Sequence, residues 1–128
     1  AVQDYSSWEA LSLAPLGEAF LRVMPSVGKS WRDHGGDPQI CGRLPAIMAA
    51  CGLRVESIAP LQRLARSSDP LWQWPATFFA NFIPRLVEQG LVSAEDWRAM
   101  ERDWQERSRD QNAFFWAPSM VEIIARRE

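Results

Sequence analysis

Residues 37–60, DPQICGRLPAIMAACGLRVESIAP, combine a helix signal, a glycine stop and a strand signal in one short segment. Leu44, Ile47 and Met48 recur at the spacing that places apolar side chains on one helical face. Gly52 follows where helices commonly end in a left-handed residue, and the β-branched run after it is typical of a strand. This helix, glycine and strand belong either to the core of a small domain or to one piece of a larger enzyme.

The bulk composition is that of an ordinary globular domain. The chain has 128 residues, of which 47% are hydrophobic and 23% charged, so a single domain, residues 1–128, can bury a core of its own. Its net charge of −2 offers no surplus of cations for a phosphate backbone, which argues against nucleic acid as a partner. Pro or Arg interrupts the apolar stretches well before the roughly 20 residues that a membrane span needs, so no span is expected.

The cysteines and the N-terminus bear on the compartment and on the extent of the protein. Cys41 and Cys51 lie on one expected helix, where a rise of about 1.5 Å per residue keeps them too far apart for a disulfide. Free thiols favour a cytoplasmic protein. The opening residues AVQDY have neither an initiator Met nor a signal-peptide pattern, and we expect the sequence to be a fragment of a longer protein.

The hydrophobic periodicity predicts an α+β arrangement with about three strands and four main helices. The segment 94–108 has the clearest helix signal, because Ser93 directly before it and Asp96 in its first turn stand in capping-box spacing. The strands are expected at 1–5, 54–59 and 119–126, and the helices at 15–31, 40–51, 70–89 and 94–108.

The sequence contains no familiar motif for phosphate or metal binding. The HGGDP stretch lacks a strand before it, a helix after it and the third glycine of a dinucleotide-binding loop. One histidine and two cysteines do not make a tetrahedral metal set. His34, the single histidine, is either a loop residue without a chemical role or a substrate contact.

Aromatic residues are the unusual feature of the composition, with seven Trp and six Phe against one Tyr. Phe78, Phe82, Trp97 and Trp104 recur at helical spacing, and such a stripe usually belongs to a core. A second group lies in loop-like segments flanked by proline, where aromatic side chains either join the core or line a ligand pocket or an interface. This group is Trp8, Trp72, Trp74 and Trp116.

Four segments, taken in order, resemble the C-terminal half of a class I S-adenosylmethionine-dependent methyltransferase. AVQDYSSWEAL is similar to the fifth strand and the loop after it, and GGDPQICGRLPAIMAACGLRVESIAP is similar to the turn, small-residue helix and sixth strand. LVEQGLVSAEDWRAMERDW resembles the helical insertion of the small-molecule branch, which includes enzymes of ubiquinone and menaquinone biosynthesis. AFFWAPSMVEIIARR resembles the closing seventh strand.

The resemblance implies a Rossmann-like sheet of which this chain supplies the acceptor side. The glycine loop and the acidic residue that hold S-adenosylmethionine in the family lie in the preceding half, which these 128 residues do not include. The parent protein would therefore be an enzyme that uses S-adenosylmethionine. We expect the fragment by itself to bind no cofactor and to be inactive.

The methyl-acceptor site is expected where the first strand ends, because ligands of open α/β sheets lie beyond the carboxyl ends of the parallel strands. Asp4, Tyr5 and His34 are the candidate catalytic groups, since they can orient or deprotonate an acceptor. In the family, segments like 15–31 and 70–89 cover the acceptor as a lid. The candidate substrate-binding residues are Ser6, Trp8, Trp31, Trp72, Trp74, Phe79 and Trp116.

Two other functions remain open from the sequence. The chain could be a noncatalytic α+β binding module whose aromatic pocket holds an apolar small molecule. It could also be an interaction domain that uses a tryptophan-rich surface to bind a partner helix. An upstream glycine loop in the gene would favour the enzyme, whereas small-molecule binding without catalysis would favour the module.

We predict that the isolated chain forms a homodimer through the exposed edge of its first strand. A strand that has lost its parallel neighbour presents unpaired backbone groups and a bare apolar face, and pairing with a second copy covers both. Light scattering over a range of concentrations measures this association. A chain that stays monomeric at high concentration would contradict the prediction.

Overall fold

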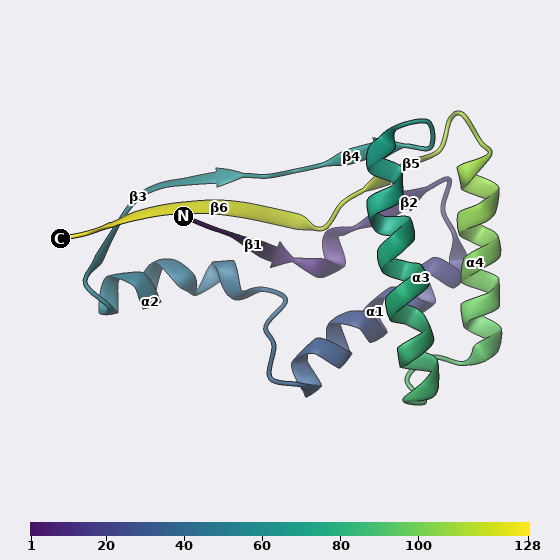
Figure 1. Ribbon diagram of the computed structural model, residues 1–128, viewed down its shortest axis with the longest axis horizontal. Coiled ribbons are helices and arrows are strands. Elements are labelled where there is room, and N and C mark those ends of the chain that lie inside the picture. Colours follow the sequence, from purple (N-terminus) through teal and green to yellow (C-terminus); the bar gives the residue numbers. More distant parts are fainter.

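The computed structural model describes residues 1–128, and its sheet strands fall into three long paths across the molecule (Figure 1). The first path joins β1 to β2, the second joins β3 to β4, and the third joins β5 to β6. The strands are β1 (Val2–Ser7), β2 (Ser12–Ala14), β3 (Leu53–Pro60), β4 (Leu64–Arg66), β5 (Phe114–Trp116) and β6 (Ser119–Arg127).

The C-terminal path lies in the middle of the sheets. One three-stranded sheet has the order β1-β6-β3 and the other has the order β2-β5-β4, and every pair is antiparallel. Because β1 and β3 both run against β6, they run in the same direction as each other. Each is an edge strand, so β1 has a free outer edge.

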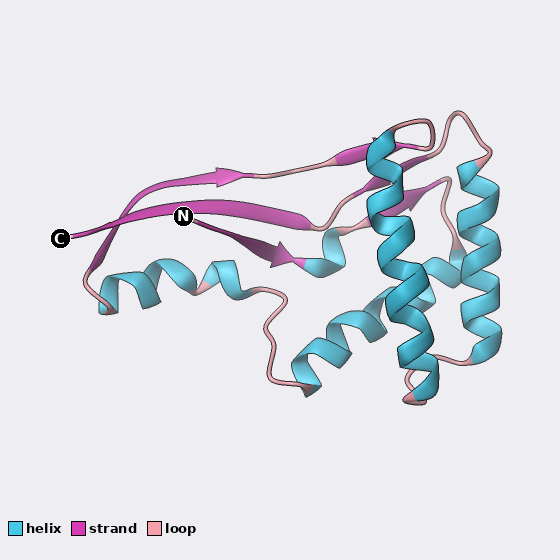
Figure 2. Cartoon of the chain, in the orientation of Figure 1, coloured by secondary structure: helices cyan, strands magenta, loops and turns pink.

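Four α-helices accompany the sheets, with short 3₁₀ turns between elements (Figure 2). The N-cap of α4 is the one that the sequence predicts, because the Ser93 hydroxyl accepts a hydrogen bond of 3.0 Å from the Asp96 N–H. The helices are α1 (Glu18–Asp33), α2 (Leu44–Ala50), α3 (Gln73–Glu88) and α4 (Ala94–Ser108). The 3₁₀ turns are η1 (Trp8–Ala10), η2 (Ile40–Gly42) and η3 (Pro70–Trp72).

The general α+β class is confirmed, but the number of strands is corrected. The expected strands 1–5, 54–59 and 119–126 correspond to β1, β3 and β6, whereas β2, β4 and β5 were not expected. Each of these three has only three residues. Two-residue alternation is recognisable over about four to eight residues, so only their pairing in the folded chain defines these strands.

Three of the expected helices differ in their limits from the observed ones. The helix expected at 15–31 starts three residues later, because Gly17 is still extended as its N-cap. The helix expected at 40–51 is divided into η2 and α2, with Pro45 in the first turn of α2, where a missing N–H costs least. The helix expected at 70–89 begins as the 3₁₀ turn η3 and becomes α-helical in α3.

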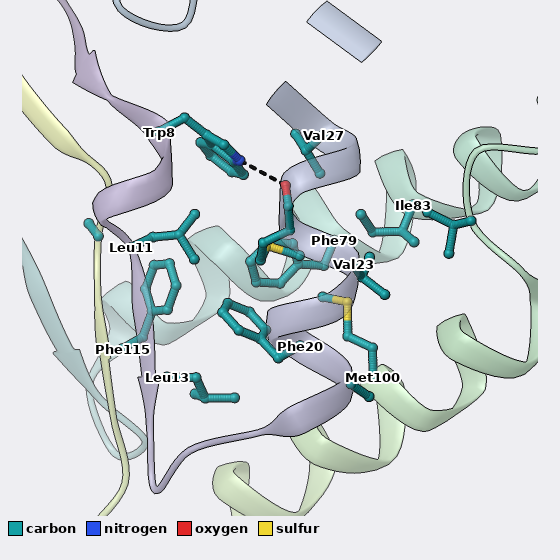
Figure 3. Packing of buried hydrophobic residues seen from close by; sticks show 14 of the residues in the cluster. Trp8, Leu11, Leu13, Phe20, Val23, Val27, Phe79, Ile83, Met100 and Phe115 are labelled. Atoms are coloured by element: carbon teal, nitrogen blue, oxygen red, sulfur yellow. Dashed lines mark hydrogen bonds between the residues drawn. The ribbon is translucent and has the colours of Figure 1, made fainter. Parts of the chain in front are cut away.

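The main core lies between the β2-β5-β4 sheet and helices α1, α3 and α4. Leu13, Ala65 and Phe115 are register partners on the buried face of that sheet, and each is 2% exposed. Figure 3 shows Phe20 and Phe79 pointing toward Phe115 and Leu13. Ring centroids of Phe20 and Phe115 lie 6.3 Å apart, and those of Phe79 and Phe115 lie 6.1 Å apart, both edge to face. Such pairs add stabilisation to their area burial.

The other end of the molecule is thinner. There α2 packs against β3 and η2 against β1. In this region Cys41, Met48 and Ile123 are buried, while Ile58 and Ile124 on the same sheet are exposed. No helix in the structure is long and apolar enough to cross a membrane.

We expect Phe115→Ala to lower the free energy of unfolding by about 3–5 kcal/mol, because it removes a ring from the centre of the core. Phe114→Ala is the matched control, since its ring is on the same strand but points outward and is 36% exposed, against 2% for Phe115. Urea unfolding followed by tryptophan fluorescence measures both. Equal losses for the two variants would contradict the observed orientation of β5.

Candidate functional site

An open pocket of about 380 Å³ lies beside the middle of β1 and the C-terminus of α1. This volume is within the range of small-molecule sites. The walls are made by three segments. These are the middle of β1, the C-terminal end of α1 and the loop that follows α1. The lining residues are Asp4, Tyr5, Trp31, His34, Gly36, Asp37 and Pro38.

Two stacked aromatic rings form one wall of the pocket. The rings of Tyr5 and Trp31 have centroids 5.8 Å apart and planes only 15° apart. Trp8 meets both rings edge to face, at 5.7 Å from Tyr5 and 4.7 Å from Trp31. The indole N–H of Trp8 donates a hydrogen bond of 3.1 Å to the Met24 carbonyl, as Figure 3 shows, so the ring behind the wall is fixed. The wall is therefore rigid before any ligand arrives.

Tyr5 has a perturbed hydroxyl. Burial of the side chain is the main cause that raises the pKa of Tyr5 above 10.0, and the negative charge of Asp4 adds to the effect. The Asp4 carboxylate accepts a hydrogen bond of 2.7 Å from the Tyr5 N–H, which keeps the two residues together. The Tyr5 hydroxyl itself has no hydrogen-bond partner within the chain. It stays protonated at neutral pH and can donate a hydrogen bond to a ligand.

His34 follows the last turn of α1 and is oriented by that helix. Its Nδ1 lies 2.7 Å from the Ser30 carbonyl oxygen, which can only accept, so Nδ1 carries the proton in the neutral ring. The lone pair is then on Nε2. The side chain is exposed at the rim of the pocket, where Nε2 can accept a proton from a bound molecule.

The loop after α1 brings a second carboxylate to the pocket. A backbone hydrogen bond from the Gln39 N–H, with the Arg43 guanidinium at 2.6 Å, lowers the pKa of Asp37 below 3.8. The loop turns tightly at Gly36, whose N–H donates to the Trp31 carbonyl at 2.8 Å. A Cβ at Gly36 would lie only 3.0 Å from that carbonyl oxygen, so a larger residue would displace the turn.

The structure brings four of the sequence-predicted residues, Asp4, Tyr5, Trp31 and His34, to one pocket. Trp8 packs directly behind the wall and is 2% exposed. The hydroxyl of Ser6 donates instead to the Ser119 carbonyl, at 3.1 Å across the β1–β6 pair.

The other predicted substrate contacts lie elsewhere. Trp72 stacks on Trp104 at 4.4 Å in the core, and Phe79 is buried among the rings around Phe115. Trp74 is exposed beside a narrow crevice that also reaches Tyr5. Trp116 points to the outer face of β5, opposite the core, because it alternates with buried Phe115. None of these four joins the Tyr5–Trp31 pocket.

Sequence reasoning missed Gly36, Asp37 and Pro38 as lining residues. The GGDP stretch was recognisable as a turn, but a turn signal does not say which strand the loop will approach. No group of three or more His, Cys, Asp or Glu side chains in the structure could hold a metal ion.

Comparison of the chain with protein-family models, with curated proteins and with solved structures finds no match.

The ionisation of Tyr5 is directly measurable, because it is the only tyrosine in the chain. We expect its phenolate absorbance to appear at higher pH than in the unfolded chain, and Asp4→Asn to move the transition part of the way back by removing the charge but not the burial. A folded-state pKa above the unfolded one means that stability falls as pH rises from about 10 through the folded pKa. A Tyr5 transition at the unfolded value would contradict the described environment.

Proposed function

We propose that this chain is the acceptor-binding part of an S-adenosylmethionine-dependent methyltransferase that acts on a small molecule. The observation that carries the proposal is that the Tyr5–Trp31 pocket lies along β1, beside Asp4 and Tyr5 and close to the carboxyl end of the strand at Ser7. In an open α/β sheet, ligands lie beyond the carboxyl ends of the parallel strands. The pocket is where such a sheet would place the methyl acceptor.

The strand directions support the same proposal. β1 and β3 run parallel to each other on either side of antiparallel β6, and the outer edge of β1 is free. An otherwise parallel sheet commonly carries an antiparallel strand near its edge. The free edge of β1 would accept the next parallel strand of a Rossmann-like sheet, and in the isolated chain it would accept a second copy.

The pocket side chains suit an acceptor that must be oriented. The stacked rings of Tyr5 and Trp31 offer a fixed aromatic surface against which a small molecule can be held, and holding reactants in register accounts for much of the rate of a displacement reaction. The Tyr5 hydroxyl can donate a hydrogen bond to the acceptor. Nε2 of His34 can take a proton from it.

These 128 residues do not fit S-adenosylmethionine by themselves. The Gly35–Gly36 turn follows helix α1 and leads into η2, whereas a nucleotide-binding glycine loop follows a strand and opens a helix. In the proposed enzyme, the cofactor would supply the methyl group and would be held by residues outside this segment. The segment alone is then inactive, and its free thiols agree with a cytoplasmic parent protein.

A noncatalytic binding module is the second candidate. It is favoured by the fact that all residues of the Tyr5–Trp31 pocket come from this chain, so the pocket needs no other segment to form. Intact mass and coding sequence of the source protein separate the two candidates. A preceding half with a glycine loop supports the methyltransferase, and its absence supports the module.

We expect the source protein to form S-adenosylhomocysteine when it is given S-adenosylmethionine together with the low-molecular-weight fraction of a cell extract as a source of acceptor. Tyr5→Phe keeps the ring stack but removes the hydroxyl, and it should lower turnover by about 100-fold, the typical effect of losing a positioned proton donor. Ser68→Ala, which removes an exposed hydroxyl that is not part of the pocket lining, is the control. Turnover that Tyr5→Phe leaves unchanged would place the acceptor elsewhere.

A further inference from the structure

We propose that the Tyr5–Trp31 pocket binds an organic ammonium ion, with the cationic group held between the Asp4 carboxylate and the two stacked rings. Binding of the ion depends only on the residues of the pocket itself. Only the identification of this ion with the methyl acceptor rests on the proposed function.

The charges that line the pocket are negative. Two acidic residues, Asp4 and Asp37, are among its lining residues, and no lysine or arginine is. Arg43 neutralises Asp37 from outside the pocket in an ion pair of 2.6 Å. Asp4 takes part in none of the nine ion pairs of the structure. The pocket therefore contains one carboxylate whose charge the chain does not neutralise.

The position of Asp4 makes that charge effective. Its side chain is partly buried, and its only hydrogen bond within the chain is the one from the neighbouring Tyr5 N–H. The same charge raises the pKa of two neighbours, the Tyr5 hydroxyl and the buried Cys41 thiol, although burial is the larger cause for both. A partly desolvated carboxylate gains most from a ligand of opposite charge.

The aromatic wall selects a particular kind of cation. Ring faces attract ammonium groups because the face of an aromatic ring is negative, and indole is the strongest of these rings. The rings of Trp31 and Tyr5 are held in place by Trp8, and Phe78 also contacts Trp31 with ring centroids 6.1 Å apart. Binding therefore requires little additional ordering of the Trp31 and Tyr5 side chains. A hydrated metal ion would not use the rings, whereas an alkylated ammonium group can contact an open ring face and the carboxylate together.

Neutral and anionic ligands fit the pocket less well. An anion would be repelled by Asp4, and an apolar molecule would cover the Asp4 carboxylate without replacing its lost hydration. The pocket volume of about 380 Å³ accommodates an organic cation of the size of a small metabolite.

The test compares choline with 3,3-dimethyl-1-butanol, its uncharged isostere, as probes of the 128-residue chain. The seven tryptophans give separate indole N–H signals in a nitrogen-15 correlation spectrum, and Trp31→Phe identifies the signal at the pocket. We expect choline to shift the Trp31 signal in a saturable way, with an affinity about fivefold or more above that of the isostere. The signal of Trp116, on the outer face of β5 in the other sheet, should not follow it.

Asp4→Asn tests the role of the carboxylate. The asparagine oxygen can still accept the Tyr5 N–H, so the loss of charge is separated from a loss of local structure. We expect choline affinity to fall by about fivefold while binding of the isostere is unchanged. Glu18→Gln is the matched control, because it removes one negative charge at the other end of α1, about 24 Å from His34 by helical rise.

Three outcomes would overturn the proposal. These are equal affinities for choline and its isostere, a choline effect that Glu18→Gln reduces as much as Asp4→Asn, and saturable shifts confined to tryptophans outside the pocket. S-adenosylhomocysteine formation does not enter these measurements. If choline does not bind as expected, the methyltransferase proposal is still decided by the turnover experiment. If the source protein forms no S-adenosylhomocysteine, the ammonium site is still decided by the choline titration.

Discussion

The pairing of the C-terminal strands with both other strand paths is the constraint on which the whole structure depends. Residues 114–127 are hydrogen-bonded on one side to the first residues of the chain and on the other to its middle, with Val2 opposite Ile123 and Leu53 opposite Arg127. Backbone groups of central strands have no alternative partner once buried. Neither sheet is therefore complete until the last residues are in place, and these contacts are distant in sequence, which slows folding.

Helices cover the two ends of the three strand paths to different extents. At β2, β4 and β5, alternation is strict, and helices α1, α3 and α4 cover the face that carries Phe115. At β1, β3 and β6, α2 and η2 supply much less cover, and Ile123 is the only fully buried residue of those strands. The Tyr5–Trp31 pocket lies between these regions. A rigid core thus supports one wall of the site, while a loop supplies the other.

A pocket with one rigid wall and one adjustable wall suits a binding site. The wall made by Tyr5 and Trp31 is continuous with the aromatic packing of the core through Trp8 and Phe78, so its geometry is set before binding. The opposite side, with His34 and Asp37, belongs to the end of α1 and its loop, where backbone adjustments are less costly. The polar groups His34 and Asp37 are therefore on the side that can adjust to a ligand. Asp4 is the exception, because it belongs to strand β1.

The sequence by itself determined the local elements with the strongest signals. The Ser93 cap predicts α4 to its observed limits, and the apolar runs predict β1, β3 and β6. It also indicated Asp4, Tyr5, Trp31 and His34 as candidates, and the structure places them around one cavity. Periodicity and capping act between residues close in the chain, which is why a single sequence reports them.

Only the tertiary structure decided what covers each side chain. Trp72 and Trp116 look alike in sequence, as tryptophans in segments near proline, yet one stacks on Trp104 in the core and the other faces outward from β5. Asp37 became a pocket residue only because the turn at Gly36 brings its loop to β1. β2, β4 and β5 exist because partners far along the chain satisfy their backbone groups, and no local pattern carries that information.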